Sequence, residues 1–162
     1  MDPVRSSLGG GIAATVVLLL FLLVADVLLA GTDLLLFATF RSLCAVGGPP
    51  YCELESTTAT LLTYVWFGLL FAVAWPLVFG AVTWALPGDS GTVHGMVFAL
   101  VLWSGHLVVA LGSAGLEGGA FADRLPLLIA TMVAYLVYGF VLGGGYDSLA
   151  EHRTFQVGDR VP

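Results

Sequence analysis

Four long apolar stretches constrain the fold of this chain more than any other feature. They cover residues 12–30, 59–86, 95–114 and 125–142. An α-helix needs about 20 mainly apolar residues to cross the hydrocarbon core of a bilayer, and each stretch is roughly that long or longer. A helix also pairs its backbone polar groups internally, as lipid requires. The sequence therefore predicts an all-α, polytopic membrane protein, a four-transmembrane-helix bundle that forms a single domain over residues 1–162.

Composition excludes a soluble globular domain. Of the 162 residues, 59% are hydrophobic and only 10% are charged, whereas soluble domains carry about 25% charged residues. The net charge of −6 argues against nucleic acid as a partner, because phosphates attract a basic surface. It also argues against a polybasic lipid anchor. All five basic residues are arginines, which together with the acidic surplus is typical of halophilic proteins; chance is the alternative, since the charges are few.

Glycine and proline mark the expected ends of the spans. Residues 1–11 are short and glycine-rich, so we expect a loose tail. Pro76 lies inside the second stretch and predicts a kink. The short turn 87–91 predicts that the second and third spans are antiparallel neighbours. Gly143-Gly144-Gly145 is expected to end the fourth span, leaving a polar C-terminal tail over 146–162.

The segment 34–46 is apolar but too short to span a bilayer, and it contains Arg41. Three placements stay open: a short interfacial helix after the first span, a re-entrant segment, or a continuation of the first helix. Gly47-Gly48-Pro49-Pro50 ends it in each case, because consecutive prolines stop a helix.

Arginine positions predict the orientation. An even number of spans places both termini on the same side of the membrane. That side carries three arginines and the opposite side carries two. Loops rich in Lys and Arg stay in the cytoplasm. We therefore expect a multi-pass protein of the cell membrane with cytoplasmic termini. Cys44 and Cys52 then face outward, where a disulfide persists; two free thiols are the alternative. Their spacing is not that of a zinc site, so no metal is predicted.

Asp26 and His106 are the candidate intramembrane polar pair. An ionisable side chain within a span is a functional-site hypothesis because placing it there costs free energy. The pair would relay a proton or bind a cation. In the structural alternative Asp26 is hydrated near the interface and His106 is a neutral side chain hydrogen-bonded to a neighbouring helix.

Small residues are expected to pack the helices closely. Gly139 and Gly143 form a GxxxG pair in the fourth span, and Gly105 and Gly112 are seven residues apart in the third, so each pair shares a helix face. Tyr135 and Tyr138 lie near the first pair and are candidates for hydrogen bonds between helices.

Neither a cofactor nor a catalytic site is predicted. His94 and His106 lie on one predicted helix, about 18 Å apart at 1.5 Å per residue, so they cannot ligate one haem iron together. His152 lies in the tail. The sequence contains no nucleophile elbow, P-loop, HExxH or CxxC motif.

Short motifs suggest a family. Gly9-Gly10-Gly11-Ile12-Ala13-Ala14-Thr15 opens the first span, Gly91-Thr92-Val93-His94-Gly95 enters the third, and Tyr138-Gly139 lies in the fourth. On these motifs the chain resembles uncharacterised small four-helix integral membrane proteins of halophilic archaea. The resemblance implies no activity and no site, but it draws attention to His94 at a tight helix entrance. An interfacial histidine that caps the helix is the alternative.

The function expected from the sequence is a non-enzymatic scaffold or accessory subunit. Its partners are then the lipid bilayer and either a second copy or a larger membrane complex. The alternative is a small oligomeric transporter or channel component that uses Asp26 and His106. A haem or redox subunit is a remote third alternative.

Overall fold

The structure is a computed structural model that describes residues 3–28, 64–114 and 120–158. Side chains are described within residues 4–25, 64–108 and 125–150, except at 126 and 127. Apart from the turn at residues 86–90, this part of the chain is helical. It contains four helices long and apolar enough to cross a membrane: Val4–Ala25, Tyr64–Ala85, Gly91–Val108 and Leu128–Ala150. The predicted all-α class with four spans is therefore confirmed.

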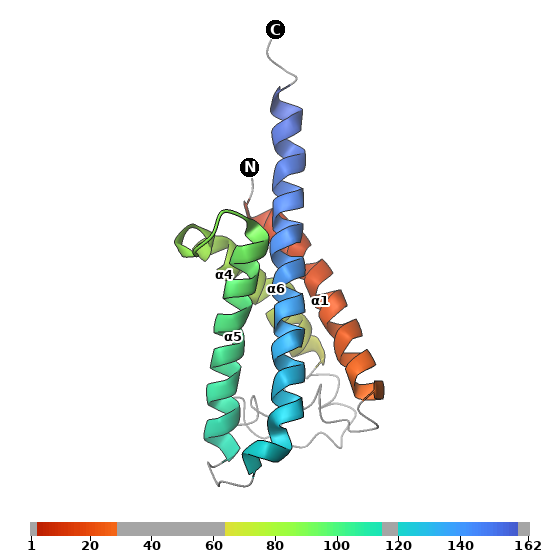
Figure 1. The fold of residues 1–162 in the computed structure, drawn as a ribbon. Coiled ribbons are helices and arrows are strands. Elements are labelled where there is room, and N and C mark those ends of the chain that lie inside the picture. Colours follow the sequence, from red (N-terminus) through yellow and green to blue (C-terminus); the bar gives the residue numbers. More distant parts are fainter. Residues whose placement is uncertain (1–2, 29–63, 115–119, 159–162) are drawn as a thin grey trace.

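The helices run alternately up and down the bundle (Figure 1). They are α1 (Pro3–Leu28), α5 (Gly91–Ala114), α6 (Ala120–Gly158) and a composite helix that we call the second span, residues 64–85. After an α-helical start at 64–69, the second span contains the π-helical turn η2 (Leu70–Ala74), α4 (Trp75–Val82) and the 3₁₀ turn η3 (Thr83–Ala85). The start of α1, the end of α6 and the turn before α5 lie at the same end of the bundle (Figure 1).

Helix α6 is the central element. It packs along α1 on one side and α5 on the other, while the second span packs mainly against α1 through η2 and α4. The short turn therefore makes the second span and α5 neighbours chiefly near the turn itself, where the Phe79 and Phe98 rings lie 5.5 Å apart. Away from the turn each helix follows a different partner.

The contact between α5 and α6 is a glycine seam, formed by Gly91, Gly95, Gly139 and Gly143. All four glycines are buried. A Cβ atom placed on Gly95 would collide with the carbonyl oxygen of Gly139, and one on Gly91 would lie 2.8 Å from that of Gly143. The backbones touch directly because no side chain stands between them, which is how small residues drive helix association in lipid.

A second close contact joins α1 to α6 and corrects the expected N-terminal tail. Residues 3–11 are the first turns of α1 rather than a loose segment. A Cβ on Gly10 would lie 2.9 Å from the carbonyl oxygen of Leu142, and one on Gly145 would lie 3.0 Å from the Cα of Gly10. The glycine run that resembled a flexible tail is thus a packing surface.

The glycine run 143–145 does not end the fourth helix either. Helix α6 continues through it to Gly158 and has 39 residues, or about 58 Å at 1.5 Å per residue. Glycine destabilises a helix that is exposed to water. Here Gly143 and Gly145 contact α5 and α1, so packing on both sides stabilises the helix. The C-terminal turns extend beyond the other helices (Figure 1).

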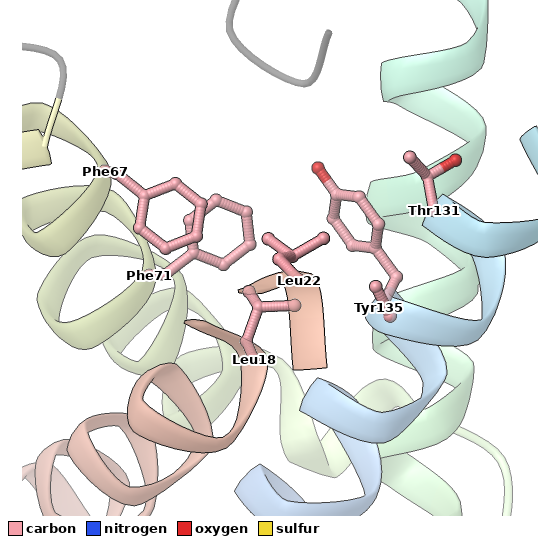
Figure 2. A pocket seen from close by; sticks show the side chains of 7 residues that line it. Leu18, Leu22, Phe67, Phe71, Thr131 and Tyr135 are labelled. Atoms are coloured by element: carbon pink, nitrogen blue, oxygen red, sulfur yellow. The ribbon is translucent and has the colours of Figure 1, made fainter. Parts of the chain in front are cut away.

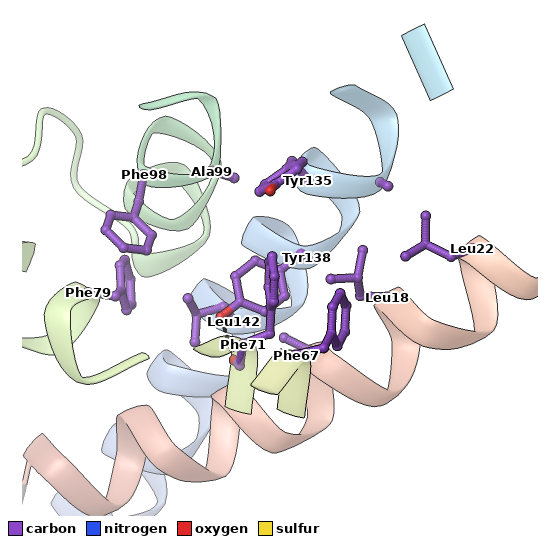
Figure 3. Packing of buried hydrophobic residues seen from close by; sticks show 12 residues of the cluster. Leu18, Leu22, Phe67, Phe71, Phe79, Phe98, Ala99, Tyr135, Tyr138 and Leu142 are labelled. Carbon is purple, nitrogen blue, oxygen red and sulfur yellow. Dashed lines mark hydrogen bonds between the residues drawn. The ribbon is translucent and has the colours of Figure 1, made fainter. Parts of the chain in front are cut away.

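Aromatic side chains fill the core between the helices (Figure 3). Phe71 packs edge-on against Tyr138 at 5.3 Å, and Phe79 packs edge-on against Tyr146 at 5.7 Å. The outward faces carry large apolar side chains, as a lipid environment favours; Val101 and Val108 on α5 are 61% and 71% exposed. Trp84 is 87% exposed in η3, at the end of its span, where an indole suits the interface.

We predict that Gly139→Ala destabilises the bundle, because the added methyl group would meet the Gly95 backbone and force α5 and α6 apart. Overpacking of this kind costs about 1–3 kcal/mol. Thermal unfolding in detergent micelles measures the effect. Gly105→Ala is the matched control, because nothing lies within 4 Å of a Cβ at Gly105; equal loss of stability in the two variants would contradict the seam.

Candidate functional site

An aromatic row crosses the bundle from α5 to the second span. The His106 ring lies 5.8 Å from the Tyr135 ring, Tyr135 lies 5.8 Å from Phe71, and Phe71 stacks on Phe67 at 4.5 Å. Tyr135 is buried and His106 is half-buried. His106 therefore contacts α6 through a ring, in the lipid-spanning part of α5.

The structure does not bring Asp26 and His106 together within the described residues. Asp26 belongs to the last turn of α1, but its side chain lies outside the described part of the chain. Helices α1 and α5 each pack along α6, and Figure 1 shows α6 between them. The proposed pairing stays a prediction.

A small cavity of about 10 Å³ lies beside the aromatic row, between α1, the second span and α6 (Figure 2). It is scarcely large enough for one water molecule. The Tyr135 ring points from α6 toward it (Figure 2). Its lining is formed by Leu18, Leu22, Phe67, Phe71, Thr131, Ala134 and Tyr135.

Tyr138 joins α6 to the second span through a buried hydrogen bond. Its hydroxyl donates to the carbonyl oxygen of Phe71 at 2.7 Å. The π-helical turn η2 immediately precedes α4, whose second residue is Pro76, the position at which the sequence predicts a kink. In a π turn the Phe71 carbonyl would accept from the N–H of residue 76, which proline lacks. The Tyr138 hydroxyl supplies that missing donor, and the predicted hydrogen bond between helices is confirmed for Tyr138.

A weaker polar contact joins α5 to α6 nearby. The Trp103 indole N–H donates to the Thr131 hydroxyl oxygen at 3.4 Å. The Thr131 hydroxyl in turn donates to the Leu128 carbonyl at 3.0 Å. Both residues lie near the aromatic row, so polar and aromatic contacts hold the same region of α5 against α6.

Asp147 holds the start of α5 against α6, and sequence reasoning missed it. Its carboxylate accepts a hydrogen bond from the Gly91 N–H at 2.7 Å. The first N–H groups of a helix have no partner within the helix and carry a partial positive charge, so a carboxylate there is stabilising. A helix cap that comes from another helix produces no characteristic residue spacing in the sequence. The one sequence signal is that Asp147 lies four residues after Gly143 and therefore on the same helix face.

His94 closes the turn that precedes α5. Its Nε2 atom lies 2.8 Å from the carbonyl oxygen of Gly88, which adopts a φ of 123°, a conformation that favours glycine. The Ser90 hydroxyl also accepts from the Val93 N–H at 3.3 Å as an N-cap. His94 therefore stabilises the turn at the start of α5 through its contact with Gly88 in that turn.

Several other candidate residues lie outside the part of the chain that the structure describes. The range 29–63 is not described, and it contains Cys44, Cys52 and the segment 34–46. The side-chain environment of Gly112 is not described either. Gly139 and Gly143 lie in the glycine seam, whereas Gly105 is exposed. Within the described ranges no three His, Cys, Asp or Glu side chains gather as a metal site would require.

We predict that Asp147→Ala lowers the stability of the bundle by about 0.5–2 kcal/mol, the range for loss of a helix N-cap. Asp147→Asn retains an oxygen acceptor but loses the charge, so a smaller loss is expected. Asp89→Ala removes an exposed carboxylate from the adjoining turn and serves as the control. Thermal unfolding in micelles compares the three; a loss in the control as large as that in Asp147→Ala would contradict the capping role.

Comparison with known proteins assigns a family but no activity. No curated protein and no solved structure matches the chain. One family model matches residues 1–157, which confirms the expectation of an uncharacterised family; an origin in halophilic archaea stays a prediction. On this match, which spans almost the entire sequence, the chain belongs to the family of unknown function DUF6789.

Proposed function

We propose that this protein is a non-enzymatic scaffold or accessory subunit of a membrane complex. The observation that supports the proposal is that polar side chains of the bundle form hydrogen bonds between its own helices. Asp147, Trp103 and Tyr138 each make a hydrogen bond to a neighbouring helix. Such contacts fix the shape of a bundle and do not by themselves bind a substrate.

The exposed apolar faces support the same proposal. Helix α1 presents Ile12, Val16, Leu20 and Val24 outward, each more than half exposed. These residues recur every four positions and form one stripe along the helix. An accessory subunit contacts its partner within the membrane through such a face, and lipid covers what the partner leaves open.

A small oligomeric transporter or channel component is the second candidate, and His106 is the observation that favours it. The His106 ring is half-buried and lies tilted against the Tyr135 ring, with the ring centres 5.8 Å apart. Its nitrogens bond to none of the residues that the structure describes. A histidine so placed is available to bind or relay a proton. With Asp26 it would form the polar pair described above.

We further propose that the protein resides in the cell membrane with cytoplasmic termini. The start of α1 and the end of α6 lie at one end of the bundle together with the turn before α5 (Figure 1). That end carries Arg5 in α1 and Arg153 in α6, so the arginine bias supports this orientation.

Affinity purification from native membranes in mild detergent tests the proposed function. We expect the tagged chain to co-purify with at least one other membrane protein in a fixed ratio, measured by quantitative mass spectrometry and native electrophoresis. The matched control is a tagged membrane protein of similar size expressed at the same level, which should not capture that partner.

A purified chain that occurs alone and moves protons or cations across liposomes would contradict the accessory role. In that case His106→Ala should abolish the flux if the transport alternative is correct. Gly105→Ala lies one residue away on the exposed face and is the control that should leave the flux unchanged.

A further inference from the structure

The buried residues of the second span follow an irregular spacing. Phe67, Phe71, Pro76 and Phe79 are its buried residues, and the steps between them are four, five and three residues. Steps of three and four belong to one face of an α-helix. The step of five is the extra residue of the π turn η2, Leu70–Ala74. The turn therefore decides which face of residues 64–71 points into the bundle.

A continuous α-helix would turn a different face inward. Counting back from Phe79 and Pro76 in regular steps places Ala72 and Gly68 where Phe71 and Phe67 now lie. The start of the second span would rotate by about 100°, one residue of a helix with 3.6 residues per turn. Phe67 would then take the outward position of Trp66. Gly68 now faces open space, with nothing within 4 Å of a Cβ built on it.

A lipid environment removes the hydrophobic cost of turning the two phenylalanine rings outward. In water the outward turn of two phenylalanine rings would be strongly opposed. In a bilayer the lipid tails are as apolar as the core, so no hydrophobic driving force separates the two faces. Packing and hydrogen bonds then decide between the registers.

One hydrogen bond belongs to the π register alone. In the present structure the Trp75 N–H bonds to the Leu70 carbonyl, and Tyr138 donates to the Phe71 carbonyl that Pro76 cannot reach with an N–H. In the α register the Trp75 N–H would bond to Phe71, and the carbonyl left without a donor would be that of Ala72. The Tyr138 hydroxyl therefore satisfies a group that needs a partner in only one register.

We propose that the start of the second span, residues 64–74, switches between two helical registers and that the Tyr138 hydroxyl selects the π register seen here. The switch breaks the aromatic row, because Phe71 leaves Tyr135. It also replaces two phenyl rings by Gly68 and Ala72 beside the cavity. The space that opens next to Leu18, Leu22 and Thr131 is an apolar pocket of the kind that accepts a lipid chain.

Disulfide mapping in lipid vesicles tests the switch on the full chain with Cys44 and Cys52 replaced by alanine. Phe67 and Leu18 line the same cavity, so the pair Phe67→Cys with Leu18→Cys reports the π register. The pair Gly68→Cys with Leu18→Cys reports the α register. We expect Tyr138→Phe to raise the yield of the second pair relative to the first about three- to tenfold, the effect of losing one hydrogen bond.

Tyr135→Phe is the matched control, because it removes a buried hydroxyl that bonds to none of the residues that the structure describes. The ratio of the two pairs should stay unchanged in this variant. The same ratio in Tyr138→Phe and Tyr135→Phe would overturn the proposal.

Pro76→Ala gives an independent test if Tyr138→Phe fails to fold. The restored N–H can pair with the Ala72 carbonyl, which removes the cost of the α register, so the Gly68→Cys pair should again increase. Circular dichroism and gel filtration establish that the variant is folded. A folded Pro76→Ala chain with an unchanged ratio also overturns the proposal.

Discussion

Direct backbone contact between α5 and α6 is the constraint on which the rest of the structure depends. In lipid, apolar burial does not drive helices together, so close packing and hydrogen bonds must do so. The glycine seam allows the two backbones to touch, and the Asp147 carboxylate fixes their register by binding the Gly91 N–H. On the other side of α6, Gly145 meets Gly10 of α1. Two helices, α5 and α1, are therefore joined through glycine contacts to the central helix α6.

The second span is held differently. It approaches α1 closely where a Cβ on Gly11 would collide with the Pro76 ring. Its contacts with α6 are aromatic, through Phe71 with Tyr135 and Tyr138, and include one hydrogen bond. Aromatic rings tolerate small changes of geometry better than touching backbones do. The bundle thus combines a close-packed unit of three helices with one helix whose register depends on a single hydroxyl group, and this combination suits a subunit that adjusts to a partner.

Hydropathy was sufficient to predict the four spans, because the length and apolarity that a helix needs to cross a bilayer can be read directly from the amino-acid sequence. The ends of the helices were harder to predict. Glycine runs at 9–11 and 143–145 suggested a tail and a stop, because glycine weakens an isolated helix. In the structure both runs pack against other helices, and that outcome depends on a neighbour that a single segment does not reveal.

In the candidate site, too, features with a local cause could be predicted from the sequence, whereas contacts between distant residues could not. Pro76 and the GxxxG pair at Gly139 and Gly143 stood out in the sequence, since each has a local physical consequence. The pairing of Tyr138 with the Phe71 carbonyl, and of Asp147 with Gly91, joins residues 67 and 56 positions apart. The spacing of the buried residues contained a usable signal, because the five-residue step from Phe71 to Pro76 does not keep to one face of an α-helix. Asp26, the most prominent charge of the first span, lies where the structure does not describe the side chain.

Disulfide formation across the glycine seam tests the central claim most directly. A Cβ on Gly144 would lie 3.7 Å from the Thr92 hydroxyl oxygen, so Thr92→Cys with Gly144→Cys, in a chain without Cys44 and Cys52, should cross-link rapidly in native membranes under mild oxidation. Val101→Cys with Ile129→Cys, both at exposed positions, should not cross-link within one molecule. Absence of the first cross-link in a folded chain, or equal yields for the two pairs, would contradict the close contact between α5 and α6.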